Sequence, residues 1–367
     1  MPSPISPLNS YIPPTPSSPL SAETFHIAGI LTTVFGLAEI PPDASEIVCL
    51  WLLHPRQDSQ KDMVGLATAI VHDYYDRRKK SSANSKQKGF IAVAFDARNH
   101  GTREIDPMAN QAWKSGNENH APDMFSVYFG TAQDTSTLID FLPAYIFPNS
   151  ERSISGHFAL GVSLGGHATW LCLLHEPRIT AGVVVVGAPD FVALMADRAR
   201  LSKLTSWLQG DAPGSGFLGS KHFPTGLLET VQKKDPAAVL SGQLDASKKI
   251  EFIRTGVYAH PADDDEGKAK TQSILDRHLR GKRILCLSGA TDKLVPYRLF
   301  EPFMSWLKGI VTPAGGNGGD GDIYLEDIVF KNTAHELTEA MMQEVLRFMY
   351  DSVLALDRPN GAKVAKI

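Results

Sequence analysis

Short runs rich in valine, isoleucine and leucine alternate along this sequence with longer segments of helical periodicity. This alternation is typical of a mostly parallel β-sheet with covering helices. The expected strands span residues 27–34, 47–53, 90–95, 155–160, 182–186, 283–287 and 322–330. The expected helices span residues 61–79, 131–145, 164–175, 297–308 and 336–355. The pattern therefore predicts an α/β fold.

Composition narrows the class of protein. Hydrophobic residues make up 43% and charged residues 21% of the 367, which is typical of a globular protein. The net charge is −4 and no long basic run is present, so a nucleic-acid partner is not expected. Cys49, Cys172 and Cys286 are widely spaced within apolar runs, which favours buried thiols in a reducing compartment. No apolar stretch is long enough to span a membrane, and we expect a cytoplasmic protein.

The alternation is interrupted at three places. Residues 1–21 are rich in proline and serine and carry no charge up to residue 20, which predicts a disordered tail without a signal-peptide core. Residues 191–281 contain no convincing strand and are too long for an ordinary connection, so we interpret them as a helical lid. The core is then expected at 22–190 and 282–356, followed by a C-terminal tail at 357–367.

Three further segments suggest functions that we weigh lower. The glycine-rich stretch 315–321 is expected to be a surface loop, because no Lys-Ser or Lys-Thr pair follows it as in a phosphate cradle. The acidic stretch 263–266 lacks metal-ligand spacing and is expected to be solvated. The terminal Ala365-Lys366-Ile367 resembles a peroxisomal address but departs from it at the first and last positions. A peroxisomal location therefore stays an alternative.

The main chemical motif is Gly161-Val162-Ser163-Leu164-Gly165-Gly166, a G-x-S-x-G between an expected strand and an expected helix. A serine on such a tight turn adopts a strained backbone, and the small residues two positions away avoid collisions with the strand and the helix. The turn presents the serine hydroxyl at the sheet edge and directs the helix N-terminus towards a developing oxyanion. This context makes Ser163 a candidate nucleophile.

A serine nucleophile needs a base and an acid to orient that base, and both follow in usable places. Asp292 comes just after an expected strand, where open α/β sheets place ligand-facing residues. His335 lies between the last expected strand and the last expected helix. Asp190 follows the preceding strand and stays an alternative acid. His100 and His167 are the other histidines in range, and we interpret both as structural.

Together these residues resemble the α/β-hydrolase superfamily. The matching pieces are the G-x-S-x-G turn, the stretch Asp96-Ala97-Arg98-Asn99-His100-Gly101, the G-x-x-D-x-x-V-P segment at 289–296 and the late histidine. The chain looks most similar to small esterases of the prolyl-oligopeptidase and dienelactone-hydrolase branch. The resemblance implies a catalytic triad of Ser163, Asp292 and His335 and requires neither a metal nor an organic cofactor.

The same resemblance implies an oxyanion hole. The superfamily normally carries His-Gly after its third strand, where an amide donates to the oxyanion, and here the matching stretch is Leu53-His54-Pro55-Arg56. Proline has no N–H, so the amide of Arg56 is the better candidate partner for the amide of Leu164.

The sequence thus predicts a serine-dependent hydrolase that cleaves an ester-like bond of a small molecule. Acyl transfer, thioester hydrolysis, carbon–carbon bond cleavage and peptide hydrolysis use the same triad and stay open as alternatives. A non-catalytic binding protein of the same fold is a further alternative. The polar stretch 117–120 is expected in a loop where it could rim the pocket. Nothing in the sequence predicts the oligomeric state.

Overall fold

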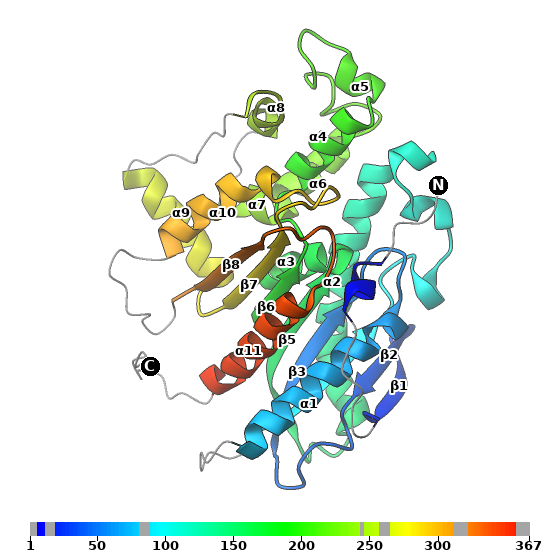
Figure 1. The fold of residues 1–367 in the computed structure, drawn as a ribbon, viewed down its shortest axis with the longest axis vertical. Helices are drawn as coiled ribbons and strands as arrows, with labels where there is room; N and C mark the ends of the chain where they lie inside the picture. Colours follow the sequence, from blue (N-terminus) through cyan, green and yellow to red (C-terminus); the bar gives the residue numbers. More distant parts are fainter. Residues whose placement is uncertain are drawn as a thin grey trace.

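The computed structural model describes residues 6–11, 19–80, 88–242, 246–256, 265–311 and 322–356. Its centre is an eight-stranded sheet with the order β1-β2-β4-β3-β5-β6-β7-β8 (Figure 1). The strands are β1 (Ala22–Ile27), β2 (Ile30–Phe35), β3 (Glu46–Leu53), β4 (Gly89–Phe95), β5 (Ser153–Val162), β6 (Ile179–Val185), β7 (Arg283–Gly289) and β8 (Tyr324–Phe330). The β1–β2 and β2–β4 pairs are antiparallel and all the other pairs are parallel. The mostly parallel sheet expected from the sequence is confirmed.

Helices connect these strands. The α-helices are α1 (Val64–Lys80), α2 (His120–Ile146), α3 (Leu164–His175), α4 (Phe191–Leu201), α5 (Thr205–Leu208), α6 (Thr225–Lys234), α7 (Pro236–Leu240), α8 (Ala246–Thr255), α9 (Asp265–Leu279), α10 (Glu301–Val311) and α11 (Glu339–Leu356). Short 3₁₀ turns occupy Pro7–Ser10, Gln60–Met63, Gly101–Arg103, Pro107–Asn110, Trp113–Ser115 and Tyr297–Leu299.

Both faces of the sheet are covered, and β3 shows how. Successive side chains of a strand point to opposite faces. One set packs with α2 and α3 and the other with α1 and α11. The first set is Ile47, Cys49, Trp51 and Leu53, and the second is Val48, Leu50 and Leu52. Because both sets are buried, β3 is a continuous apolar run, as strands of covered parallel sheets are.

The first expected strand, 27–34, is wrong as a single element. The chain instead forms a hairpin of β1 and β2, and the turn between them is Ala28-Gly29 with φ angles of 50° and 81°. Two consecutive positive φ angles match the right-handed twist of a two-residue hairpin. Most of β1 is exposed at the sheet edge, so it lacks the apolar run that marks the buried strands.

Helix α2 begins eleven residues before the expected start at residue 131. Pro122 lies in its first turn, where the missing N–H costs no intrahelical hydrogen bond. Gly130 also lies within the helix, and the Arg98 side chain packs against it, since an added Cβ would come 2.5 Å from Cδ of Arg98. The helix therefore crosses two residues that usually mark its end.

The expected disordered tail is wrong for residues 6–11. The 3₁₀ turn Pro7–Ser10 packs on the body of the protein, with Leu8 and Tyr11 buried among residues of α1 and α11. The carbonyl of Pro7 accepts a 2.8 Å hydrogen bond from the N–H of Leu337. Apolar side chains and a distant backbone donor thus hold a segment that has no charge of its own. Residues 1–5 and 12–18 lie outside the described part of the chain.

The described residues between β6 and β7 form helices α4 to α9, joined by turns and loops that include an isolated bridge between Ser220 and Phe223. Figure 1 shows α4, α5 and α8 at the top of the view. A buried cluster anchors this segment. Asp190 caps α4 by accepting from the N–H of Ala193 and forms an ion pair with Lys249 of α8. Asp235 accepts from the N–H of Phe191 at 3.1 Å, and burial followed by the charge of Asp190 raises its pKa well above the usual range.

Three of the segments singled out in the sequence lie wholly or partly outside the described residues. The glycine-rich residues 315–321, the tail 357–367 and the first two residues of the acidic stretch lie outside the described residues. The other two, Asp265 and Glu266, begin α9, where negative charge stabilises a helix N-terminus. Among the described residues, no helix is long and apolar enough to cross a membrane.

The buried ion pair gives a stability prediction. Replacing Lys249 with alanine leaves Asp190 buried without its counter-charge, so we expect Lys249→Ala to lower the free energy of unfolding by about 3 kcal/mol or more. Denaturant titration measures this change. The neighbouring Lys248 is exposed, and Lys248→Ala is the matched control, expected within about 0.5 kcal/mol of the parent. Equal stability of the two variants would contradict the prediction.

Candidate active site

Ser163 occupies a strained turn between β5 and α3. Its φ and ψ angles are 56° and −110°, a conformation that residues with side chains rarely adopt. Its N–H donates to the carbonyl of Val185 in β6 at 2.9 Å. Helix α3 starts at the next residue, Leu164, whose N–H has no acceptor within its own helix. The turn thus places the hydroxyl beside a free helix N-terminus.

Two glycines make this turn possible. A Cβ on Gly161 would lie 2.0 Å from the carbonyl oxygen of Gly165, and a Cβ on Gly165 would lie 1.9 Å from the carbonyl oxygen of Leu53. Both contacts are with backbone, which cannot rotate away as a side chain can. The close approach of β5, α3 and β3 around Ser163 therefore requires glycine at both positions.

The three residues expected to act together form one hydrogen-bonded chain. The Ser163 Oγ lies 2.7 Å from Nε2 of His335, and Nδ1 of the same ring lies 2.7 Å from Oδ2 of Asp292. An ionised carboxylate only accepts, so Nδ1 carries a proton and Nε2 accepts from the serine hydroxyl. The sequence separations are 172 and 43 residues, and the sheet brings the three side chains to one edge.

Asp292 is held in its charged form. Burial raises its pKa, but hydrogen bonds from His335 and from the amides of Leu294 and Val295 outweigh burial and lower the pKa below the usual range. The two amides donate to Oδ1 at 2.8 and 2.9 Å. Oδ2 is left for the histidine. The carboxylate can therefore orient the ring and stabilise its positive charge once a proton arrives.

The other candidates for acid and base have different partners. Asp190 is engaged by Lys249 and Ala193, so it is not the carboxylate that contacts His335. Nδ1 of His100 bonds to the carbonyl of Arg98. Nδ1 of His167 contacts the backbone of Ala188, and burial lowers the pKa of His167 to about 3. This ring lines the pocket but stays neutral.

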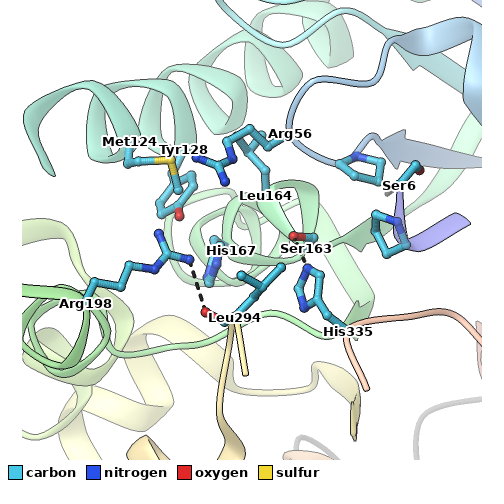
Figure 2. Close-up of a pocket in the computed structure, with 12 residues that line it drawn as sticks. Ser6, Arg56, Met124, Tyr128, Ser163, Leu164, His167, Arg198, Leu294 and His335 are labelled. Carbon is cyan, nitrogen blue, oxygen red and sulfur yellow. Dashed lines mark hydrogen bonds between the residues drawn. The ribbon is translucent and has the colours of Figure 1, made fainter. Parts of the chain in front are cut away.

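A small pocket opens in front of Ser163 (Figure 2). Its open space is about 30 Å³, enough for a few water molecules. The wall is formed by the turn after β3, by α2, α3 and α4, by the segment after β7 and by the N-terminal segment. The lining residues are Ser6, Pro7, Pro55, Arg56, Met124, Tyr128, Ser163, Leu164, His167, Arg198, Leu294 and His335.

The turn after β3 orients the peptide group between Pro55 and Arg56. The carbonyl of Pro55 accepts from Nδ1 of His54 at 2.6 Å, while Nε2 of the same ring accepts from the N–H of Ala97. In a trans peptide the N–H points away from the carbonyl. The N–H of Arg56 is therefore directed away from the His54 ring, and it donates to no acceptor among the described residues. Burial lowers the pKa of His54 to about 4, so this ring is neutral.

Solved structures share the fold of this chain. TT1662 from Thermus thermophilus is 17% identical, with a TM-score of 0.52 over 93% of this chain and 99% of that one. The chain has the α/β-hydrolase fold. The esterase Est1E from Butyrivibrio proteoclasticus (11% identity, TM-score 0.42, 92% and 98% covered) and dipeptidyl peptidase 4 from Porphyromonas gingivalis (11%, 0.46, 90% and 35%) are more distant likenesses. No family model and no curated protein sequence matches the chain.

Within this α/β-hydrolase fold, several residues that line the pocket were not expected there from the sequence. Arg198 comes from α4, inside the segment expected to be a lid, and Tyr128 comes from the part of α2 that was expected to be a loop. Ser6 and Pro7 come from the segment expected to be disordered. The polar stretch 117–120 was the one local signal, because His120 contacts the Arg198 side chain. Among the described residues, no cluster of three or more histidine, cysteine or acidic side chains could hold a metal ion.

The glycine contacts give a second prediction. We expect Gly165→Ala to lower the free energy of unfolding by about 3 kcal/mol or to prevent folding, because the added methyl collides with the Leu53 carbonyl. Gly226 is exposed in α6, and a Cβ there would have no atom within 4 Å, so Gly226→Ala is the control. It should be neutral or stabilise by up to about 1 kcal/mol. Thermal denaturation of both variants tests this, and a fully stable Gly165→Ala protein would contradict it.

Proposed function

We propose that this chain is a serine hydrolase that cleaves an ester-like bond of a small molecule. The observation that carries the proposal is the continuous hydrogen-bonded chain from Ser163 through His335 to Asp292 on a strained turn. A serine hydroxyl is a weak nucleophile unless a base removes its proton, and this geometry supplies the base and its orienting acid. The small pocket supports a small substrate.

The proposed reaction has two steps. The Ser163 Oγ attacks the ester carbonyl while Nε2 of His335 takes the hydroxyl proton, and collapse of the tetrahedral intermediate breaks the ester bond and returns that proton to the leaving alcohol. Water then attacks the acyl-enzyme, giving its proton to the same nitrogen. The second collapse releases the carboxylic acid and restores the serine hydroxyl. One ester and one water become one acid and one alcohol.

The amides of Leu164 and Arg56 are the proposed oxyanion donors. Leu164 is the first residue of α3, so the helix dipole adds to its N–H. The Arg56 N–H is directed by the bond between His54 and the Pro55 carbonyl. Both donors are fixed before substrate binds, which is the condition under which such groups stabilise a transition state most.

We also propose that residues 191–281 serve as the lid over this site. Helix α4 supports this assignment because it carries Arg198 into the pocket wall. The buried pair of Asp190 and Lys249 at the base of α4 ties α8 to the same helix. In this arrangement the insertion supplies part of the substrate surface, while the nucleophile, base and acid come from the core.

Covalent labelling tests the nucleophile. We expect a fluorophosphonate probe to label the protein, and Ser163→Ala to abolish labelling and to lower kcat/KM for 4-nitrophenyl acetate by about 10³-fold or more. The circular dichroism spectrum should stay that of the parent. The probe reports this site because attack on phosphorus requires an activated serine.

Ser206 offers a matched control. Its Oγ lies 2.7 Å from Nδ1 of His222, but Ser206 lies in the short helix α5 and no described carboxylate bonds to His222. Ser206→Ala should therefore keep both labelling and turnover. Persistent labelling of Ser163→Ala would contradict the proposal, as would the loss of labelling in Ser206→Ala alone.

The acid is tested by two isosteric changes. Asp292→Asn should lower kcat by about 10³- to 10⁴-fold, because an amide cannot hold the required tautomer or stabilise the charged ring. Asp190→Asn removes a carboxylate with no contact to His335, so its kcat per labelled active site should stay within a few fold of the parent. Counting sites with the fluorophosphonate corrects for unfolded protein. The reverse pattern would assign the acid to Asp190.

A further inference from the structure

Two arginine side chains line the pocket in front of Ser163. Arg56 follows β3 and Arg198 lies on α4, and both are partly buried. Figure 2 shows both guanidinium groups on the side of the pocket away from Ser6, with the Tyr128 side chain close to them. Burial, followed by the charge of Arg198, lowers the pKa of Arg56 to about 10. Burial also lowers the pKa of Arg198. Both nevertheless stay positively charged near neutral pH.

Neither arginine forms an ion pair with a carboxylate among the described residues. Arg198 donates to the carbonyl of Leu294 at 3.2 Å and to Nε2 of His120 at 3.3 Å. Arg56 donates to the carbonyl of Asn110 at 3.2 Å. These neutral acceptors satisfy single N–H groups, but each guanidinium has five donors and a full positive charge. The pocket therefore holds two positive charges that its own walls do not neutralise.

The two carboxylates whose charges act on Arg198 are already engaged by other partners. Asp197 precedes Arg198 on α4, but it pairs with Arg200 at 2.6 Å and with Arg298 at 3.0 Å. Asp292 accepts from His335 and from two backbone amides. Neither carboxylate can serve the pocket arginines without losing these partners.

Neighbouring groups do not supply negative charge either. Nδ1 of His120 bonds to the carbonyl of Gln111 at 2.8 Å, so its Nε2 is the neutral acceptor that faces Arg198. Burial, followed by the charges of Arg198 and Arg56, lowers the pKa of His120 well below the usual range. The buried hydroxyl of Tyr128 lies against the Arg198 guanidinium and donates its proton to no described residue. Burial chiefly raises the pKa of Tyr128 to about 12, so this hydroxyl is neutral.

Two other arginines in this part of the protein, outside the pocket, are paired with a carboxylate. Arg98 and Arg103 follow β4, and both bond to the carboxylate of Asp134 in α2, at 2.9 and 2.8 Å. That cluster is a structural ion-pair network. The contrast shows that unpaired guanidinium groups are a property of the pocket and not of arginines in this region generally.

We propose that the pocket binds a carboxylate of the substrate, so that the natural ester is a half-ester of an acid with a second, free carboxyl group. Two guanidinium groups and the Tyr128 hydroxyl can donate to one planar carboxylate, and charge-assisted bonds of this kind are the strong ones. The planar fork of N–H groups on a guanidinium matches the plane of a carboxylate. This inference rests on the proposed hydrolase function and names its substrate class.

Matched esters test the inference. We compare kcat/KM for the 4-nitrophenyl half-ester of glutaric acid with that for 4-nitrophenyl 5-oxohexanoate, in which a neutral methyl ketone replaces the carboxylate. The parent protein should prefer the half-ester by about tenfold or more. Arg198→Met should lower this ratio by at least about tenfold. Arg56→Met should do the same, because it removes the guanidinium and keeps the backbone N–H.

Arg200→Met is the control on the same helix, since Arg200 is paired with Asp197 and does not line the pocket. It should preserve the ratio. A parent ratio of one or less, or a ratio that Arg198→Met leaves unchanged, overturns the inference.

A measurement on the parent protein avoids dependence on variant folding. Glutarate should inhibit hydrolysis of the neutral ester competitively, and more strongly than either glutaramide or inorganic phosphate at the same concentration. Equal inhibition by the diamide, or stronger inhibition by phosphate, overturns the carboxylate assignment. Fluorophosphonate labelling separates the two proposals: a labelled Ser163 without carboxylate preference leaves the hydrolase standing, whereas an unlabelled protein removes both.

Discussion

The backbone contact between α3 and β3 is the constraint on which the site depends. The Leu53 carbonyl oxygen occupies the space that a Cβ of Gly165 would need, so the start of α3 lies directly against the end of β3. Ser163, which joins β5 to the start of α3, adopts its positive-φ conformation at this close approach and presents its hydroxyl at the sheet edge. It also places the amide of Leu164 beside the turn that contains Arg56. A strained serine and a helix N-terminus beside the turn after β3 therefore accompany one packing requirement.

Parallel strands then collect the remaining groups. Arg56, Ser163, Asp292 and His335 each follow the carboxyl end of a strand, and parallel pairing brings these ends to one edge of the sheet. Burial and local hydrogen bonds set the charges of Asp292, His54 and His167 around this edge. Amides keep Asp292 ionised, whereas burial keeps the neighbouring His54 and His167 rings neutral. One histidine is thus left between a carboxylate and a serine, while the others act as fixed hydrogen-bonding groups.

The insertion and the N-terminal segment complete the pocket from outside the sheet. Asp190 caps α4 and is paired with Lys249, so a buried charge pair holds the helix that carries Arg198. Pro7 is bonded to Leu337, two residues after His335, and thereby closes the opposite wall. The chemistry of the wall differs between its two sides. Guanidinium groups lie on one side, and a proline and a serine on the other (Figure 2).

Local signals in the sequence were sufficient to predict the layered sheet, the strained turn at Ser163 and the order of serine, acid and base along the chain. Periodicity and a G-x-S-x-G between strand and helix can be read without knowing any distant partner. These signals were insufficient to predict the edge strand β1, the start of α2 and the ordered residues 6–11. The order of residues 6–11 depends on contacts with residues far away in the sequence. The folded chain was needed to show which aspartate contacts His335 and that Arg56 and Arg198 share one pocket. Both findings depend on distances between residues far apart in the chain, which no local pattern encodes.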